Sequence, residues 1–360
     1  MNYKLSVIIP TYNAEDYLLE AVESVKKQTL GFENIELILV DDKPKDKEGE
    51  EGNEQPTLKF TNSKKLDDNS NDNTKTILKD LSSKYENIKS ILLDGNSGTA
   101  SKPRNEGIKA STTDYIMFLD NDDIYYPEMC ERMYNTIIDE DCDVVSCRYN
   151  INSEESSKTP HSFLNKYDNY IKINSINEFE DLMTLGHPTM IWTKLFRKSM
   201  ILNNNIEFPE GDLYEDVYFC VKSYLHANGI VLLNDFWGYG YQLRTEGENK
   251  STCQVFSQNM LEKQFRGFLK LMDLIGNDYN RLKSELIIDM TKIYIYADID
   301  KTCENEFLAK MKPFYKNYKI STKVYTAGIP FNLVINIFIK LFATSNGIAR
   351  FASRAYKKLR

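Results

Sequence analysis

Residues 115–123 read YIMFLDNDD, an apolar run that ends in a cluster of carboxylates. Tyr115 to Leu119 have the length and composition of a buried β-strand, and Asp120 to Asp123 follow it directly. Clustered carboxylates repel one another, and a hard divalent cation, Mg²⁺ or Mn²⁺, relieves that repulsion while substrate phosphates fill its remaining positions. A helix-capping turn before Pro127 is the alternative interpretation, so the neighbouring segments have to decide between the two.

Short apolar runs alternate with helix-period segments through the first 150 residues, which is typical of an α/β fold with a mostly parallel sheet flanked by helices. The other predicted strands are Leu5 to Ile9, Ile35 to Val40, Ile88 to Leu93 and Val144 to Cys147, and the predicted helices are Ala14 to Gln28, Thr74 to Tyr85 and Pro127 to Asp139. In such sheets ligands bind beyond the carboxyl ends of the strands. The four strand ends concerned here are Pro10 to Asn13, Asp41 and Asp42, Asp94 to Gly98, and Asp120 to Asp123. All of them except the first are acidic.

The composition limits the possible partners. The 360 residues carry a formal net charge of −8, yet no Asp or Glu follows Glu306, and 11 Lys or Arg lie between Lys310 and Arg360. An acidic body with a basic tail argues against nucleic acid as the main partner, because a binding groove needs basic residues within the folded body. Six scattered cysteines without a CxxC pair, no signal sequence after Met1 and no run of about 18 apolar residues predict a reduced, cytoplasmic protein that does not cross a membrane.

One segment interrupts the α/β pattern. Lys43 to Asp68 is rich in Lys, Glu, Gly and Asn and nearly lacks large apolar residues, so we expect a flexible insert. Its removal would join Asp41 and Asp42 directly to the helix-capping run Asn69 to Thr74.

Four sequence blocks together resemble glycosyltransferase family 2, an inverting family with the GT-A nucleotide-sugar-binding fold. The blocks are Ser6 to Asn13, Leu39 to Asp42 joined across the insert to Asn69 to Thr74, Gly98 with Arg104, Asn105, Gly107 and Ala110, and Tyr115 to Asp123 with its Asp-x-Asp motif. Their order and spacing make the resemblance specific over about residues 4 to 130, and it is looser to about residue 250.

The resemblance implies roles for particular donor-binding residues. Pro10, Thr11 and Tyr12 would line the nucleobase pocket, Asp41 beside Asp42 would hold the base edge, and Arg104 would approach the nucleotide. Asp120 would belong to the same donor site, and Asp122 and Asp123 would meet the ribose and the metal. Elementary chemistry agrees, because an aromatic turn stacks on a base and carboxylates accept hydrogen bonds.

An alternative to one of these roles comes from the insert. Asp67 and Asp68 precede Asn69 and could supply the base-reading acid instead. We favour Asp41 and Asp42, since only they end an apolar strand.

The candidate general base lies in the second half of the chain. Glu215 and Asp216 open an apolar helical run, where a carboxylate is placed by fixed backbone, and the family's Glu-Asp motif occupies this relative position. We predict that Asp216 is the base, with simple capping of the first turn as the alternative. For Trp192 and Trp237, core packing is favoured over stacking on a sugar.

We therefore predict a GT-A catalytic domain over residues 1–250 and a helical C-terminal region over 251–360, with Leu261, Phe265, Phe268 and Met272 on one stripe. The basic, amphipathic tail 330–360 either lies on the anionic inner face of the cytoplasmic membrane or packs on the acidic body. The predicted function is transfer of a hexosyl or N-acetylhexosaminyl group from a nucleotide-sugar donor, UDP-linked, to a hydroxyl of a glycan or lipid-linked acceptor in cell-surface polysaccharide synthesis. A non-catalytic nucleotide-sugar-binding subunit is the alternative.

Overall fold

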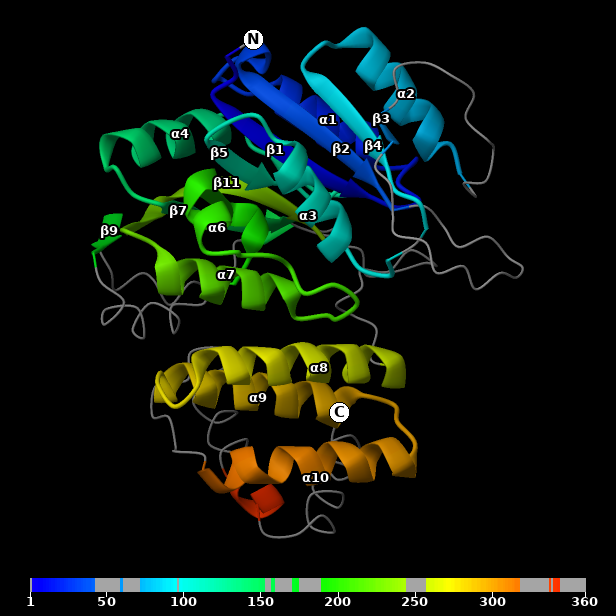
Figure 1. Cartoon of the computed structure of the whole chain (residues 1–360), viewed down its shortest axis with the longest axis vertical. Coiled ribbons are helices and arrows are strands. Elements are labelled where there is room, and N and C mark those ends of the chain that lie inside the picture. The colour runs from blue at the N-terminus through cyan, green and yellow to red at the C-terminus, as the bar shows by residue number, and fades with distance from the viewer. Residues whose placement is uncertain are drawn as a thin grey trace. The chain divides into compact units, whose positions relative to one another are not determined.

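The computed structural model describes residues 2–42, 59–60, 72–95, 97–152, 157–158, 170–174, 189–243, 257–317, 337 and 339–343. The chain divides into two compact units, shown in Figure 1. The first comprises Met1–Ile176, Thr189–Gly211 and Glu215–Leu243, and the second comprises Asn177–Pro188, Asp212–Tyr214 and Arg244–Arg360. The predicted domain boundary at residue 250 lies outside the described residues and stays a prediction.

The first unit is built on one sheet in which eleven strands are described. In chain order they are β1 (Leu5–Thr11), β2 (Ile35–Asp41), β3 (Lys59–Phe60), β4 (Ile88–Leu92), β5 (Tyr115–Phe118), β6 (Ile124–Tyr125), β7 (Val144–Asn152), β8 (Ser157–Lys158), β9 (Tyr170–Ile173), β10 (Lys194–Arg197) and β11 (Ile230–Gln242). β1 pairs in parallel with β2 and with β5, and β2 pairs in parallel with β4. The five strands predicted from apolar runs are all present.

Beyond β5 the sheet differs from the mostly parallel prediction. β10 lies between β5 and β7 and is antiparallel to both, whereas β11 is parallel to β7 and antiparallel to β6 and β9. β10 was not predicted as a strand because only Leu195 and Phe196, between two basic residues, are apolar. At the other edge, Lys59–Phe60 of the predicted insert pairs with β4.

Helices cover the sheet of the first unit. They are α1 (Leu18–Lys26), α2 (Thr74–Lys84), α3 (Ser101–Ala110), α4 (Met129–Asp139), α6 (Lys198–Asn203) and α7 (Glu215–His226), with 3₁₀ turns at Phe32–Asn34 and Ile191–Thr193. α3 packs on β1 and β2 (Figure 1). This approach needs Gly107, since a Cβ there would lie 2.4 Å from Ile8 Cγ2. The close packing of α3 fixes the position of Arg104 one turn earlier.

The described part of the second unit is helical, with α8 (Gln258–Ile275), α9 (Asn280–Tyr296) and α10 (Lys301–Asn317). The predicted stripe on α8, from Leu261 to Met272, is buried. Phe307 of α10 joins the three helices, because its ring lies 4.9 Å from that of Phe265 and 4.8 Å from that of Tyr294. None of the helices in the described residues combines the length and apolar character of a membrane-spanning segment. Most of the predicted tail, 330–360, lies outside the described residues.

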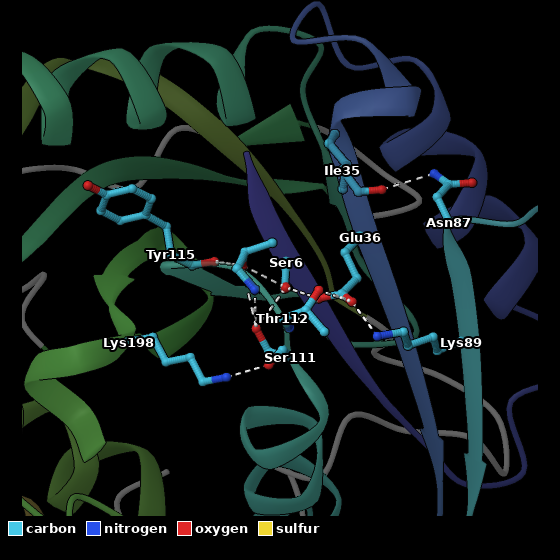
Figure 2. Close-up of polar contacts among 10 residues, drawn as sticks. Ser6, Ile35, Glu36, Asn87, Lys89, Ser111, Thr112, Tyr115 and Lys198 are labelled. Carbon is cyan, nitrogen blue, oxygen red and sulfur yellow. Dashed lines mark hydrogen bonds and ion pairs between the residues drawn. The ribbon is translucent and has the colours of Figure 1, made fainter. Parts of the chain in front are cut away.

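The amino ends of β1, β2 and β4 are held by a buried carboxylate. Glu36 accepts hydrogen bonds from Ser6 Oγ and Lys89 Nζ, both at 2.5 Å, and from the N–H and hydroxyl of Thr112, both at 2.8 Å (Figure 2). Burial opposes ionisation of Glu36, but these donors outweigh it and hold its pKa below the ordinary value. A fully satisfied buried anion of this kind fixes the strands relative to the end of α3.

Replacing Glu36 by Gln is expected to destabilise the protein by about 1.5–3 kcal/mol, the contribution typical of hydrogen bonds to a charged group. Glu23→Gln serves as the matched control, because its ion pair with Lys26 lies on the surface, where solvent screens such pairs and they contribute little to stability. Urea unfolding measures both. Since the pKa of Glu36 is lowered by folding, its contribution should be present above about pH 4.3 and be lost as the pH falls further. Equal effects of the two substitutions would contradict this role.

Candidate active site

The carboxyl ends of β1, β2 and β5 bring the predicted site segments to one edge of the sheet. Thr11 ends β1 opposite Asp41, which ends β2, and Thr11 Oγ1 donates a 2.9 Å hydrogen bond to Asp41 Oδ1. β5 continues past Phe118 through a hydrogen bond from Leu119 N to Ile8 O, so that Asp120 follows at the same edge. The parallel pairing therefore assembles the segments that the sequence separates.

The residues predicted to line a base pocket differ in exposure. Pro10 and Thr11 are buried, whereas the side chain of Tyr12 is exposed. Asp41 is 2% exposed, and burial raises its pKa to about 6, against the opposing effect of the Thr11 hydroxyl. Asp42 accepts hydrogen bonds from the N–H and hydroxyl of Ser97, which ties β2 to the loop before α3.

The start of α2 is attached to the turn after β1. Thr74 Oγ1 accepts a 2.7 Å hydrogen bond from Ala14 N, and the carboxylate of Asp72 accepts from Glu15 N at 3.2 Å and from Thr74 Oγ1 at 2.7 Å. The charge of Asp72 also contributes to the raised pKa of Asp41. Asp72, from the second half of the second sequence block, thus lies within electrostatic reach of Asp41 in the first half, although the insert separates them in sequence. Asp67 and Asp68 lie outside the described residues, so the alternative that they supply the acid is untested.

The acidic turn after β5 places its carboxylates in different surroundings. Asp123 is buried and accepts hydrogen bonds from Tyr239 Oη at 2.6 Å and Gln242 N at 2.7 Å. Burial and the charges of Asp120 and Asp122 raise its pKa, and the two hydrogen bonds oppose that rise. Both oxygens of Asp123 hold the turn against β11, whereas the neighbouring Asp122 is half-buried.

A metal at this turn would need ligands from elsewhere. Across the residues that the structure describes, no three His, Cys, Asp or Glu side chains are grouped so that they could hold an ion by themselves. Mg²⁺ is usually bound through one or two carboxylates with substrate phosphates and water completing the shell. The acidic turn fits that kind of site and does not fit a site made of protein ligands alone.

Arg104 lies at the centre of the candidate site. Its Nη1 is 2.7 Å from Asp216 Oδ1 and 3.2 Å from Glu215 Oε1, and its Nη2 is 2.9 Å from Asp120 Oδ1. The side chain is 4% exposed, and its guanidinium lies 5.5 Å from the centre of the Phe208 ring. The family resemblance implied that Arg104 approaches the nucleotide, and its partners in the structure are carboxylates from the acidic turn and from α7.

Asp216 occupies the first turn of α7, as predicted, and its side chain keeps an exposed fraction of 28%. Burial raises its pKa, Arg104 opposes that rise, and the charges of Glu215 and Asp120 add to it. One guanidinium shared by three carboxylates leaves negative charge in excess, so a raised pKa is the physical expectation. A carboxylate with a pKa raised toward neutrality and access to solvent has the properties of a general base.

Sequence reasoning missed several residues around the site. Tyr239 and Gln242, which hold Asp123, are more than 100 positions away from it, and Lys194 is a fully buried lysine on β10. Tyr239 and the aromatic residues nearest to it in its strand occupy alternate positions, and this alternation was the signal from which a buried Tyr239 could have been predicted. Trp192 is nearly buried and stacks on Tyr239 at 4.2 Å, so the core-packing interpretation of Trp192 is confirmed.

Comparison with known proteins identifies a family. The model described as Glycosyl transferase family 2 matches residues 6–55 and 66–200, and the unmatched residues 56–65 fall within the predicted insert. The chain is 30% identical over 257 residues to a poly(ribitol-phosphate) beta-glucosyltransferase of Bacillus spizizenii, covering 71% of this chain and 35% of that protein. It is 28% identical over 264 residues to the poly(ribitol-phosphate) beta-N-acetylglucosaminyltransferase TarS of Staphylococcus aureus, covering 72% and 39%. The chain thus spans little more than a third of the length of these relatives.

The fold is similar to that of a solved structure. The crystal structure of S. aureus TarS residues 1–349 in complex with UDP-GlcNAc aligns with a TM-score of 0.67 at 20% identity, covering 99% of this chain and 92% of that one. The predicted fold class, an α/β GT-A fold with a helical C-terminal region, is confirmed.

Proposed function

Since the chain belongs to glycosyl transferase family 2, we propose that it is an inverting glycosyltransferase that uses a UDP-sugar. It would move a hexosyl or N-acetylhexosaminyl group to a hydroxyl of a glycan or lipid-linked acceptor in cell-surface polymer synthesis. One observation carries the proposal: the candidate base Asp216 and the acidic turn share the guanidinium of Arg104. The base and the donor end of the site are therefore neighbours.

The donor would bind along the carboxyl ends of β1 and β2. The exposed ring of Tyr12 offers a face on which a nucleobase can stack, and Asp41 offers a carboxylate that accepts from a base N–H. The matched TarS structure holds UDP-GlcNAc, which supports a uracil nucleotide here. Asp42 would act through its hydrogen bonds to Ser97.

Asp122, with Asp120 beside it, would hold Mg²⁺ or Mn²⁺ together with the donor diphosphate, and such a cation stabilises the charge of a departing diphosphate. Asp216 would accept the proton of the acceptor hydroxyl, whose oxygen attacks the anomeric carbon from the side opposite the leaving group. No covalent intermediate with the chain is required for inversion.

The proposed location of the reaction is the cytoplasmic side of the membrane. The five described cysteines are free, which is consistent with a reducing compartment. A basic tail would attach the enzyme to the inner face of the membrane beside a lipid-linked acceptor.

The proposal predicts UDP release from UDP-glucose or UDP-GlcNAc that depends on both an acceptor, tested first with ribitol-phosphate oligomers, and Mn²⁺ or Mg²⁺. Chelation should abolish it. Asp122→Asn should lower it at least about 10²-fold with the fold intact, whereas Asp235→Asn, at a surface ion pair with Arg132, should not. Full turnover in chelator would remove the metal from the mechanism. Donor binding without transfer to any acceptor would favour a non-catalytic subunit.

Asp216→Asn removes the proton acceptor but keeps the size of the side chain, so kcat should fall about 10²–10⁴-fold while donor affinity persists. In the parent enzyme, kcat should fall on the acidic side at a pH well above about 4, because the pKa of Asp216 is raised and only the ionised form accepts a proton. Near-normal turnover in the variant would show that another group is the base.

Nucleobase binding should weaken as the pH falls through about 6, since Asp41 becomes protonated there and no longer offers a carboxylate. Calorimetry with uridine rather than UDP between pH 5 and 8 avoids titration of the ligand's phosphate. Asp41→Asn should bind uridine with an affinity that no longer changes with pH over this range. An unchanged pH dependence in that variant would contradict the role of Asp41.

A further inference from the structure

The guanidinium of Arg104 is largely occupied by protein groups. Nη1 donates hydrogen bonds to Glu215 and Asp216, and Nη2 donates one to Asp120. Nε is buried and has no hydrogen-bond partner in the described structure. A guanidinium carries five N–H donors, and here both terminal nitrogens are directed at carboxylates of the chain. Little of this side chain remains to contact a nucleotide.

We propose that Arg104 is a positioning residue that holds the base carboxylate of Asp216 and the donor-side carboxylate of Asp120 on one guanidinium, and that it is not a ligand of the nucleotide. The inference rests on the proposed function, because it takes Asp216 as the base. It replaces the role that the family resemblance implied for Arg104.

The surroundings of Arg104 make it a rigid support. α3 packs closely against β1 at Gly107. Asn105, the residue after Arg104, exchanges hydrogen bonds of 2.9 and 3.0 Å with the backbone of Phe208. The Phe208 ring in turn lies beside the guanidinium. A base must be held within a fraction of an ångström of its productive position, and an arginine that donates to the base and is itself fixed by packing does this.

The ion pair between Arg104 and Asp216 also affects how readily Asp216 ionises. Five groups act on this carboxylate: Arg104 of α3, Glu215 and Cys220 of α7, Asp120 after β5 and Lys194 of β10. Of the fixed charges, Arg104 makes the direct contact with Asp216. Loss of the guanidinium would leave Asp216 facing two further carboxylates and would make it harder to ionise.

Arg104→Lys keeps the positive charge but loses the planar guanidinium that donates to Asp120 and Asp216 together. The variant therefore distinguishes a role in positioning these carboxylates from a role in binding the nucleotide. We expect kcat to fall at least about 10²-fold, with the donor KM and the affinity for UDP, measured by calorimetry, within about twofold of the parent. Arg132→Lys is the matched control, because Arg132 forms an exposed ion pair with Asp235 and should change neither quantity. A tenfold loss of UDP affinity with kcat preserved would overturn the proposal and restore Arg104 as a nucleotide ligand.

A second variant keeps the proposal testable if Arg104→Lys does not fold. Glu215→Gln preserves size and removes one negative charge that shares Arg104, so the acidic limb of the kcat–pH profile should move to lower pH. A limb that stays in place in the folded variant would overturn the shared-guanidinium arrangement. If the parent protein itself transfers no sugar from any UDP donor, the proposed function fails. Normal kcat in Arg104→Lys with an active parent defeats this inference alone.

Discussion

The position of β1 between β2 and β5 is the constraint on which the site depends. All seven residues of β1 are buried, and its parallel register sets Thr11 level with Asp41 on one side and Ile8 level with Phe118 on the other. Both faces of the strand are buried, so a shift of one residue would exchange them and remove Ile8 from the position where it packs against Gly107, and the register is therefore strongly specified. The carboxylates at the ends of β2 and β5 are thus placed by the burial of apolar residues several positions earlier.

The two edges of this sheet handle buried charge differently. At the amino edge Glu36 is satisfied by Lys89, Ser6 and Thr112, and folding lowers its pKa. At the carboxyl edge three carboxylates share one guanidinium, and folding raises the pKa of Asp216. Complete satisfaction is the expected state of a structural polar cluster, whereas excess charge of one sign is costly and is characteristic of functional sites. The contrast separates a structural acid from catalytic candidates within one sheet.

Local sequence signals were sufficient for part of this picture. Apolar runs predicted the strands that end at Asp41 and Asp120, because a fully buried strand has a composition that its neighbours do not share. They could not predict β10, whose two apolar residues stand between Lys194 and Arg197, nor the pairing of Asp123 with Tyr239 across 116 positions. The family resemblance pointed to Arg104 but not to its partners in the structure, since ion pairs depend on how α3, α7 and β5 pack, and the role of Arg104 stays a prediction. The insert and the tail lie mostly outside the described residues, and their roles stay predictions.

The electrostatics of the site also bear on how a donor could enter it. Asp120, Glu215 and Asp216 contact Arg104, Asp122 and Asp123 follow Asp120 in the acidic turn, and a nucleoside diphosphate would bring further negative charge. The mutual repulsion already present is visible in the raised pKa of Asp123, to which Asp120 and Asp122 both contribute. With Arg104 committed to three carboxylates, its charge is not available to neutralise a diphosphate as well. In the proposed mechanism, a divalent cation that entered with the donor would resolve both problems, because it would attract the carboxylates of the turn and the phosphate oxygens together. Under the proposed mechanism, donor binding itself would therefore depend on the metal, before any demand of the transfer step.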